Sequence, residues 1–202
     1  MQRLRDATSD EHYQAEHHPF QQAMLNGDLS RQDYVDWLGQ MYLIHGALEG
    51  ALRRAVGENE GLSAVVVEHQ YQLPYLRRDL EFFAVEPEAI EPLPATERFM
   101  ALVGRNQDDP MWLLGLHYVL EGSNNGSRFL ARRVARAHDL APGQGLRYLD
   151  PYGDSQRDNW MEFKRAMDAL ELSGPDRDRL VEAARQMYRT VSELADDLTA
   201  SR

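Results

Sequence analysis

Three histidines in the sequence each precede a glutamate by four residues: His12 before Glu16, His45 before Glu49, and His117 before Glu121. Four residues make about one helical turn, so the two side chains of each pair lie on the same face of a helix. A histidine that binds a metal through one ring nitrogen commonly bonds a carboxylate through the other. The same spacing is also typical of an ordinary polar pair on a helix surface. Both interpretations are open for all three pairs.

A di-iron centre is the less favoured of the metal interpretations. Di-iron carboxylate bundles carry Glu-x-x-His, with the glutamate three residues before the histidine. None of the seven histidines has Glu or Asp at that position. His12 is a different case, because it lies in the amphipathic segment LRDATSDEHYQAEHHPF with small and apolar residues near its face. The residues alone leave His12 open to being either a core histidine bonded to Glu16 or a metal or haem ligand.

The segment VLEGSNNGSRFL, residues 119–130, places six weak helix formers in a row within an apolar helical pattern. These six residues cost roughly 0.5–1 kcal/mol each relative to alanine, or about 3–5 kcal/mol together. Gly122 and Gly126 lie on one face of the helix, where the bare backbone can come into contact with a partner. That partner is either another helix or a flat ligand. The length of the run favours the ligand, because Ala or Ser would normally satisfy a helix contact.

Composition limits the classes of protein that the chain can belong to. With 43% hydrophobic residues among 202, we expect one domain over residues 1–202. The 33 acidic and 22 basic residues give a net charge of -11, which argues against binding to nucleic acid or to an anionic membrane. There is no cysteine, so disulfides, thiolate metal sites and cysteine nucleophiles are excluded. The sequence shows no apolar signal segment and no run of 18 apolar residues, and we expect a soluble, cytoplasmic protein.

Apolar residues follow a helical spacing nearly everywhere, and β-branched alternation is scarce. We therefore predict an all-α bundle of seven to nine helices. Ser30 with Asp33 predicts an acidic capping box, and Asp109-Pro110 predicts another helix start. Pro74 predicts a kink or break. The expected helices cover residues 2–16, 31–57, 61–84, 95–105, 110–138, 156–171 and 175–199.

Four segments together resemble the haem oxygenase family, especially its bacterial biliverdin-forming members. The segment LRDATSDEHYQAEHHPF is similar to the family's proximal helix, Leu-basic-x-Ala-Thr-x-x-x-His-x-x-Ala-Glu, and YVLEGSNNGSRFL is similar to the bacterial distal helix with Glu-Gly-Ser-x-x-Gly. LNGDLSRQDYVDWLGQMYLIHGALE resembles the segment leading into the second long helix. WMEFKRAMDAL resembles the C-terminal helix that meets the haem propionates. The two helix motifs also agree with the family in order and spacing.

The resemblance implies a single-domain haem-oxygenase-like helical bundle that cleaves the haem ring with O2 and electrons, giving biliverdin, Fe2+ and CO. Haem is then both substrate and cofactor. By the same resemblance, His12 is the axial ligand of the haem iron and Glu16 supports it. Gly122 and Gly126 let the distal helix lie directly over the haem, which explains the run of weak helix formers.

The resemblance also implies roles for polar residues around the haem. Arg5 and Lys164, the only lysine in the chain, match basic positions that contact the propionates. The mammalian pattern has a distal aspartate where this chain has Ser123, and a tyrosine where it has His45. We therefore expect that water held by Ser123, Asn125 or His45 delivers protons, although a core histidine bonded locally is an equally open interpretation of His45.

Haem and an external electron donor, such as ferredoxin or a flavin reductase, are the partners that the resemblance implies. An acidic ferredoxin would need a local basic patch on this acidic protein, for which Arg132, Arg133 and Arg136 are the candidates. The main alternative function is a haem-binding carrier or sensor on the same scaffold that does not open the ring. A non-haem metal oxidase is less favoured. A thiaminase-like hydrolase lacks its cysteine nucleophile here.

Overall fold

The computed structural model describes residues 1–200, in which ten α-helices and three short 3-10 turns follow one another without a β-strand. The helices are α1 (Gln2–Ala7), α2 (Ser9–Glu16), α3 (Pro19–Asn26), α4 (Arg31–Glu58), α5 (Glu60–Ser63), α6 (Leu73–Phe82), α7 (Pro94–Arg105), α8 (Pro110–His138), α9 (Gln156–Ala169) and α10 (Gly174–Ala200). The turns are η1 (Glu68–Gln70), η2 (Pro87–Ala89) and η3 (Gly153–Ser155). The all-α class is confirmed. The eight helices of eight or more residues agree with the predicted number.

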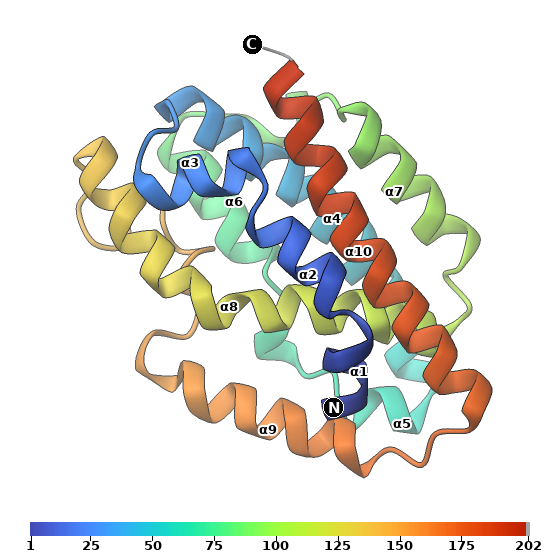
Figure 1. Ribbon diagram of the computed structural model, residues 1–202. Coiled ribbons are helices and arrows are strands. Elements are labelled where there is room, and N and C mark those ends of the chain that lie inside the picture. The colour runs from blue at the N-terminus through green and yellow to red at the C-terminus, as the bar shows by residue number, and fades with distance from the viewer. Residues whose placement is uncertain (201–202) are drawn as a thin grey trace.

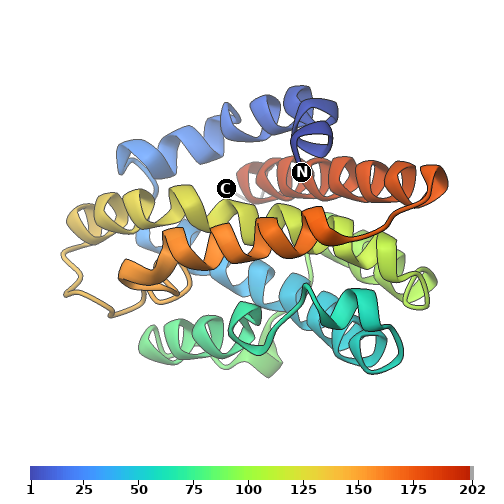
Figure 2. The ribbon, with the colours of Figure 1, turned by 90° about the horizontal axis from the view of Figure 1, so that it is seen from below.

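Three helices of 28, 29 and 27 residues, α4, α8 and α10, carry the architecture. α10 packs along α8, while α4 packs against α6, α7 and α8. Figure 1 shows α2 beside α10 in front of α8, and α2 contacts α10. Figure 2 shows α1 to α3 as an outer layer, with α8, α9 and α10 in the middle and α4 and α6 beyond them. No helix within residues 1–200 combines the length and the apolar content that a membrane span requires.

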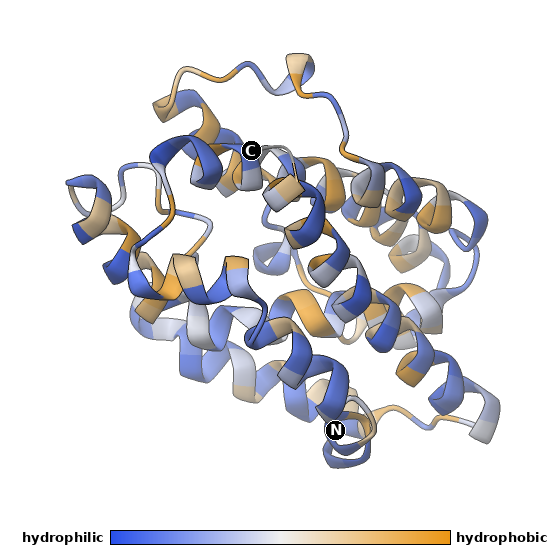
Figure 3. Ribbon diagram, turned by 45° about the horizontal axis from the view of Figure 1, so that its top comes forward, coloured by the Kyte–Doolittle hydropathy of each residue, from blue (hydrophilic) through white to orange (hydrophobic). Residues whose placement is uncertain are grey.

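α8 crosses α10 in close contact at Gly115. A Cβ atom on Gly115 would lie 2.5 Å from the carbonyl oxygen of Leu180 and 2.7 Å from the Cβ of Ala183. Only glycine fits between two helix backbones at this separation. Leu113, Leu180 and Ala183 are 3% exposed or less around it. In Figure 3 the apolar residues gather on the inward sides of the helices. The crossing at Gly115 therefore fixes where α8 runs relative to α10.

Both predicted helix starts are confirmed. Ser30 Oγ accepts a hydrogen bond from the amide of Asp33 at 3.1 Å, and the Asp33 carboxylate accepts one from the amide of Ser30 at 3.2 Å. This reciprocal box begins α4. Asp109 accepts a bond from the amide of Trp112 at 3.1 Å, and Pro110 is the first residue of α8. The two longest helices therefore begin where local side chains satisfy their free amide groups.

The prediction of one helix over residues 2–16 is wrong, because the chain turns at Thr8 between α1 and α2. The buried Thr8 hydroxyl donates to the carbonyl of Leu4 at 3.0 Å. Arg185 of α10 donates two hydrogen bonds, of 3.1 and 2.8 Å, to the carbonyl of Ala7. These bonds occupy carbonyl groups at the end of α1. The break is therefore held by a contact with α10 that the local sequence does not contain.

Helix α3 was not among the expected helices. His18 acts as its N-cap and accepts a hydrogen bond from the amide of Phe20 at 3.2 Å. Pro19 occupies the first turn, and Gly27 ends the helix with φ at +82°. Histidine is not among the preferred N-cap residues, so the start of this short helix carries a weak signal.

The prediction of one helix over residues 61–84 is also wrong, since the segment forms α5, η1 and α6. The buried carboxylate of Glu49, on α4, accepts hydrogen bonds from the amides of Gln72 and Leu73 at 2.6 and 3.1 Å. These amides begin α6, and Pro74 lies in its first turn, where proline needs no amide partner. The break predicted at Pro74 is therefore confirmed as the start of a new helix, which the distant carboxylate of Glu49 holds in place.

Replacing Gly115 by alanine is expected to destabilise the protein by about 1–3 kcal/mol, the usual cost of overpacking a tight core contact. Urea unfolding monitored by circular dichroism measures the change. Gly104→Ala is the matched control, because a Cβ there has no neighbour within 4 Å in residues 1–200. The control should be neutral or more stable by up to about 1 kcal/mol. Equal stability of the two variants would contradict the tight crossing.

Candidate functional site

His12 lies on the outer side of α2 with half of its side chain exposed (50%). Its Nε2 is 3.2 Å from Glu16 Oε1, so the predicted pair does form within one helical turn. The ring of His12 lies 5.4 Å from the ring of Tyr188 on α10, at an angle of 60°. The contact with Glu16 uses one of the two ring nitrogens. The pair therefore has the arrangement of a ligand and its supporting carboxylate, at an accessible position.

The glycine face of α8 is partly bare. A Cβ on Gly122 would lie 3.5 Å from the ring of Trp160, on α9. A Cβ on Gly126 would have no neighbour within 4 Å in the described residues, apart from the local backbone of its own helix. α8 remains one unbroken helix through this segment. The backbone at Gly126 is thus open to a partner outside the described chain, as expected for a ligand contact.

Aromatic side chains connect His12 on α2 with the glycine face on α8. Tyr188 stands beside His12, and its pKa is raised by burial and then by the nearby Tyr118 and Glu16. Tyr118 lies one turn before Gly122 on α8, and its ring centroid is 6.3 Å from that of Trp160. Burial raises the pKa of Tyr118, with Arg5 acting in the opposite direction. Tyr188, Tyr118 and Trp160, here called the aromatic wall, therefore extend from the histidine towards the glycines.

The basic residues expected at the propionates lie on the two helices that border this wall. Arg5 is exposed on α1 and lies close enough to Tyr118 to affect its pKa. Lys164 is half-buried on α9, one turn after Trp160, so the two residues share a side of that helix. The structure therefore brings a guanidinium and an ammonium group near the same aromatic wall from different helices.

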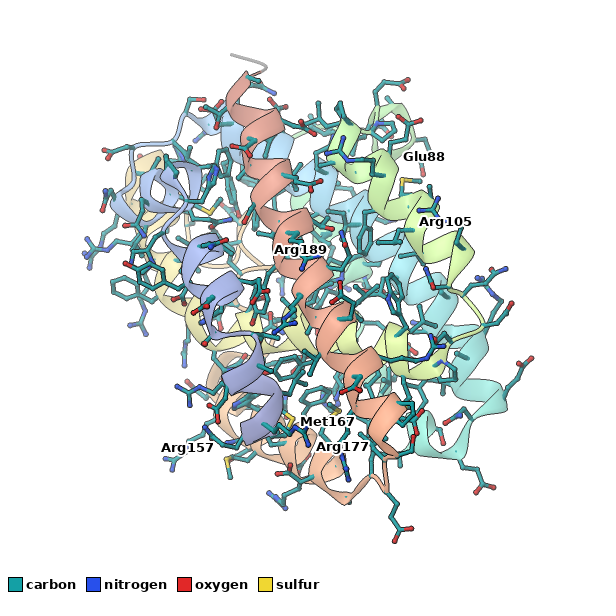
Figure 4. The ribbon with its side chains drawn as sticks, turned by 45° about the vertical axis from the view of Figure 1, so that its right-hand side comes forward. Glu88, Arg105, Arg157, Met167, Arg177 and Arg189 are labelled. Carbon is teal, nitrogen blue, oxygen red and sulfur yellow. The ribbon has the colours of Figure 1, made fainter. Side chains whose placement is uncertain are left out.

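Open space adjoins this basic end of the site. A cavity of about 600 Å³ lies between α1, α9 and α10, with Leu4, Met167 and Leu180 among its apolar lining residues. Arg3 and Arg177 also line it. Figure 4 shows Met167 and Arg177 close together below α1. Asp168, Asp178 and Glu182 line the cavity as well, so its charges are balanced and the lining does not by itself favour a ligand that carries carboxylates.

The polar residues of the weak helical run are bonded to their own helix. Ser123 Oγ donates to the carbonyl of Leu120 at 2.7 Å, and Ser127 Oγ donates to that of Ser123 at 2.9 Å. Asn125 Nδ2 donates to the carbonyl of Gly122 at 2.9 Å. Such bonds within a helix leave the acceptor oxygens for further contacts, and Asn125 Oδ1 accepts one from Gln156 Nε2 at 3.4 Å. Ser123 and Asn125 are exposed, so a water molecule can reach them.

His45 lies in the core, 3% exposed, and is not in contact with Ser123 or Asn125 through any hydrogen bond described for residues 1–200. Its Nδ1 is 2.9 Å from Glu49 Oε1 and its Nε2 is 3.0 Å from the Tyr148 hydroxyl. Both ring nitrogens thus have protein partners. The predicted water contact of His45 requires one of these two partners to give way.

A second buried cluster lies on the flank of α8 next to Gly122. Tyr152 donates a hydrogen bond of 2.8 Å to Glu121 Oε2, and Asn124 donates one of 3.2 Å to the same oxygen. Gln72 donates to the Tyr152 hydroxyl at 3.1 Å. Since the amide of Gln72 bonds Glu49, the cluster is continuous with the partners of His45. Burial raises the pKa of Glu121 to about 7, although the bonds from Tyr152 and Asn124 lower it.

The three histidine–glutamate pairs do not converge. His117 is buried and bonds Gln70 Oε1 through Nε2 at 3.0 Å, while Glu121 bonds Tyr152 instead of the histidine. Within residues 1–200, no three His, Asp or Glu side chains come together as a group that could hold a metal ion. Each pair has the predicted helical spacing, but packing of the helices separates the pairs. His12 and Glu16 are exposed, His45 and Glu49 lie in the core, and Glu121 belongs to the Tyr152 cluster.

Sequence reasoning missed four of the residues that build the site. Tyr118 carried a usable signal, because it lies four residues before Gly122 and therefore on the same face. Trp160 stood within the segment that resembled the C-terminal helix. Tyr188 and Tyr152 carried no such signal, since tertiary packing alone brings them to His12 and Glu121.

The fold is that of the haem oxygenases. Heme oxygenase-2 from Synechocystis, in complex with heme and NO, superposes with a TM-score of 0.92 at 24% identity, covering 99% of this chain and 85% of that chain. Heme oxygenase from Leptospira interrogans superposes with a TM-score of 0.87 at 23% identity, covering 95% and 96%. Among curated proteins, the heme oxygenase of Rhodella violacea is 22% identical over 98% of this chain and 86% of its own length.

The family model described as Heme oxygenase matches residues 1–197. The chain therefore belongs to the haem oxygenase family, which is a family of enzymes.

The buried His117 should make the protein less stable in acid. Burial, followed by the nearby His45, lowers the pKa of His117 from 6.5 to about 3 in the folded protein. Below pH 6.5, His117 therefore binds a proton in the unfolded chain but stays neutral in the folded one. The free energy of unfolding falls as the pH drops from 6.5 toward 3. Between pH 7 and pH 5 the loss from this group is about 2 kcal/mol.

His117→Gln, which keeps a donor for Gln70, should remove that loss. Urea unfolding of both proteins at pH 7 and pH 5 gives the difference. Comparing the two proteins cancels the opposite contributions of Asp79 and Glu121, whose raised pKa values favour the folded state in acid. An identical pH dependence in the variant would show that His117 is not the group responsible.

Proposed function

We propose that this protein opens the haem ring with O2 and electrons from an external donor, giving biliverdin, Fe2+ and CO, and that residues 1–202 act as one domain in doing so. The observation that carries this proposal is the pairing of an accessible His12 on α2 with a bare glycine face at Gly126 on α8. The aromatic wall of Tyr188, Tyr118 and Trp160 joins them. A flat, mostly apolar ligand with one metal atom fits that combination.

When bound, haem supplies the iron that activates dioxygen and the ring that is cleaved. His12 would bind the iron, with Glu16 orienting the imidazole through its hydrogen bond. Gly122 and Gly126 would leave the helix backbone as the roof of the pocket, with space for a small molecule only. The heme complexes of the Synechocystis enzymes, which share this fold, support the ligand class.

The propionates would be held from two helices by Arg5 and Lys164. A guanidinium and an ammonium group together neutralise two carboxylates, and both side chains donate hydrogen bonds to carboxylate oxygens. Their position beside the same aromatic wall supports this assignment. The rest of the haem would lie against apolar and aromatic side chains.

On the distal side, we propose that Ser123 and Asn125 hold water that carries protons. Both side chains are exposed next to the glycine face. Ser123 Oγ keeps its acceptor lone pairs, and Asn125 Oδ1 accepts one bond from Gln156 at 3.4 Å and has a second lone pair. His45 would join only if it exchanged Tyr148 for water. This engagement of His45 is the specific observation that favours the second candidate function, a haem carrier or sensor that does not open the ring.

Titration of the apoprotein with hemin tests the proposal. We expect a Soret band that saturates at one haem per chain. Addition of ascorbate or a ferredoxin system in air should then replace the band by the broad red absorbance of biliverdin. His12→Ala should remove the Soret band of the bound form. A band that persists after reduction would favour the carrier, and no band would contradict haem binding altogether.

Gly126→Leu probes the roof in the same titration. The side chain enters space that is open in the described chain, so the apoprotein should stay as stable as the wild type or gain up to about 1 kcal/mol. Haem affinity should fall by at least about tenfold, a loss of about 1.4 kcal/mol. Gly57→Leu, at another glycine with no neighbour within 4 Å, is the control and should bind haem normally.

For the electron donor, we propose a docking surface formed by Arg132, Arg133 and Arg136, which are exposed on the last turns of α8. Exchanging all three for glutamate should slow ferredoxin-driven turnover by at least about tenfold at low salt, because steering between opposite charges is lost. Turnover driven by ascorbate, a small reductant, should not change. Equal loss with both reductants would show damage to the site rather than to docking.

A further inference from the structure

Glu121 is a buried acid that the functions assigned above leave unexplained. It is 1% exposed, and it directly precedes Gly122 on α8. Its neighbours come from three elements: Asn124 on α8, Tyr152 at the start of η3, and Gln72 at the start of α6, which reaches it through Tyr152. A buried carboxyl group without a cationic partner is costly when ionised. A buried acid at this position, beside the glycine face, is therefore a candidate for a role in the reaction.

One oxygen of Glu121 carries both hydrogen bonds. Tyr152 and Asn124 donate to Oε2, whereas Oε1 is buried and has no hydrogen-bond partner among residues 1–200. In the protonated acid the proton therefore lies on Oε1, since Oε2 is already accepting two bonds. Gln72 Oε1 is a second buried oxygen without a partner in the same part of the chain, on the other side of the Tyr152 hydroxyl. The cluster thus has spare acceptors and lacks donors.

The surroundings keep Glu121 near the point at which it gains or loses a proton. Burial raises its pKa to about 7, and the bonds from Tyr152 and Asn124 oppose that shift. The other titratable groups around the cluster are His117 one turn earlier on α8, Tyr75 on α6, His69 in η1, and Glu49 and His45 on α4 beyond Gln72. The pKa of His117 lies near 3, so His117 stays neutral. No cation in this group holds Glu121 ionised.

We propose that Glu121 stores an exchangeable proton at Oε1 and supplies it to the Gly122 side of α8, where the haem reaction consumes protons. This role rests on the proposed haem oxygenase function. Glu121 would take over the supply of protons in a chain that has Ser123 in place of the distal aspartate. Cα atoms of consecutive residues are about 3.8 Å apart. Because Glu121 directly precedes Gly122, its backbone borders the glycine face, and the proposal requires water to carry the proton from the carboxyl group to that face.

The transfer moves a proton and no electrons. Oε1 loses its proton and the carboxyl becomes a carboxylate, which Tyr152 and Asn124 stabilise through Oε2. Oε1 then regains a proton from solvent through water on the Gly122 side of α8, while Tyr152 and Asn124 keep their hydrogen bonds to Oε2. Glu121 is thus restored after each transfer.

Infrared titration of the apoprotein tests the stored proton without haem. A carboxylic-acid C=O band should disappear with a midpoint near pH 7 and should be absent in Glu121→Gln. In Tyr152→Phe the same band should persist to higher pH, because the lost hydrogen bond favoured the carboxylate. Glu81→Gln, the same change at an exposed position on α6, should leave the band as in the wild type. No band titrating near neutral pH would overturn the proposal.

Turnover of the haem-loaded protein tests the supply. Glu121→Gln should bind haem with unchanged affinity but open the ring at least about tenfold more slowly, since positioned acids contribute roughly 100-fold or more. Its rate should also lose the fall near pH 7 that the wild type shows as Glu121 ionises. A rate within tenfold of the wild type overturns the role of Glu121 alone. Failure of the wild type to open the ring overturns the proposed function, and the role of Glu121 with it.

Discussion

An unbroken α8 is the constraint on which the rest of the structure depends. Its middle, residues 122–127, costs about 3–5 kcal/mol relative to alanine. Packing on either side offsets that cost: Trp112 and the apolar residues 113–120 are buried before the run, and Ala131 and Val134 after it. The close crossing with α10 at Gly115 fixes the direction of the helix. The weak segment is thus held as helix by well-packed neighbours, which permits bare backbone at Gly126.

The two sides of this helix divide the chemistry between them. One face, with Gly122 and Gly126, lacks side chains and is joined by aromatic rings to His12. The adjoining flank carries Glu121 and Asn124 into a buried hydrogen-bonded cluster with Tyr152. A ligand that lies on the open face is therefore close to a group that can exchange protons while it remains shielded from solvent. The helix thereby forms both the roof of the proposed pocket and the support of its proton supply.

Two buried carboxylates, Glu49 and Asp79, fix segments between the long helices by accepting hydrogen bonds from backbone amides far away in the sequence. Glu49 starts α6 by accepting the amides of Gln72 and Leu73. Asp79 accepts the amides of Arg147 and Tyr148 at 2.9 and 2.8 Å and so fixes the loop before α9. That loop delivers Tyr148 to His45 and Tyr152 to Glu121. Because each carboxylate bonds backbone amides far away in the sequence, the polar clusters and the loop are positioned together.

Residue spacing and capping within single helices were enough to predict the all-α class, the starts of α4 and α8, the face shared by Gly122 and Gly126, and the pairing of His12 with Glu16. The breaks at Thr8 and before α6 were decided by Arg185 and Glu49, side chains from distant helices. Likewise, helix packing placed Tyr188 beside His12 and separated the three histidine–glutamate pairs. It also left one oxygen of Glu121 buried without a hydrogen-bond partner among residues 1–200. Local periodicity tells which side of a helix a residue occupies, but packing alone decides which neighbour that side meets.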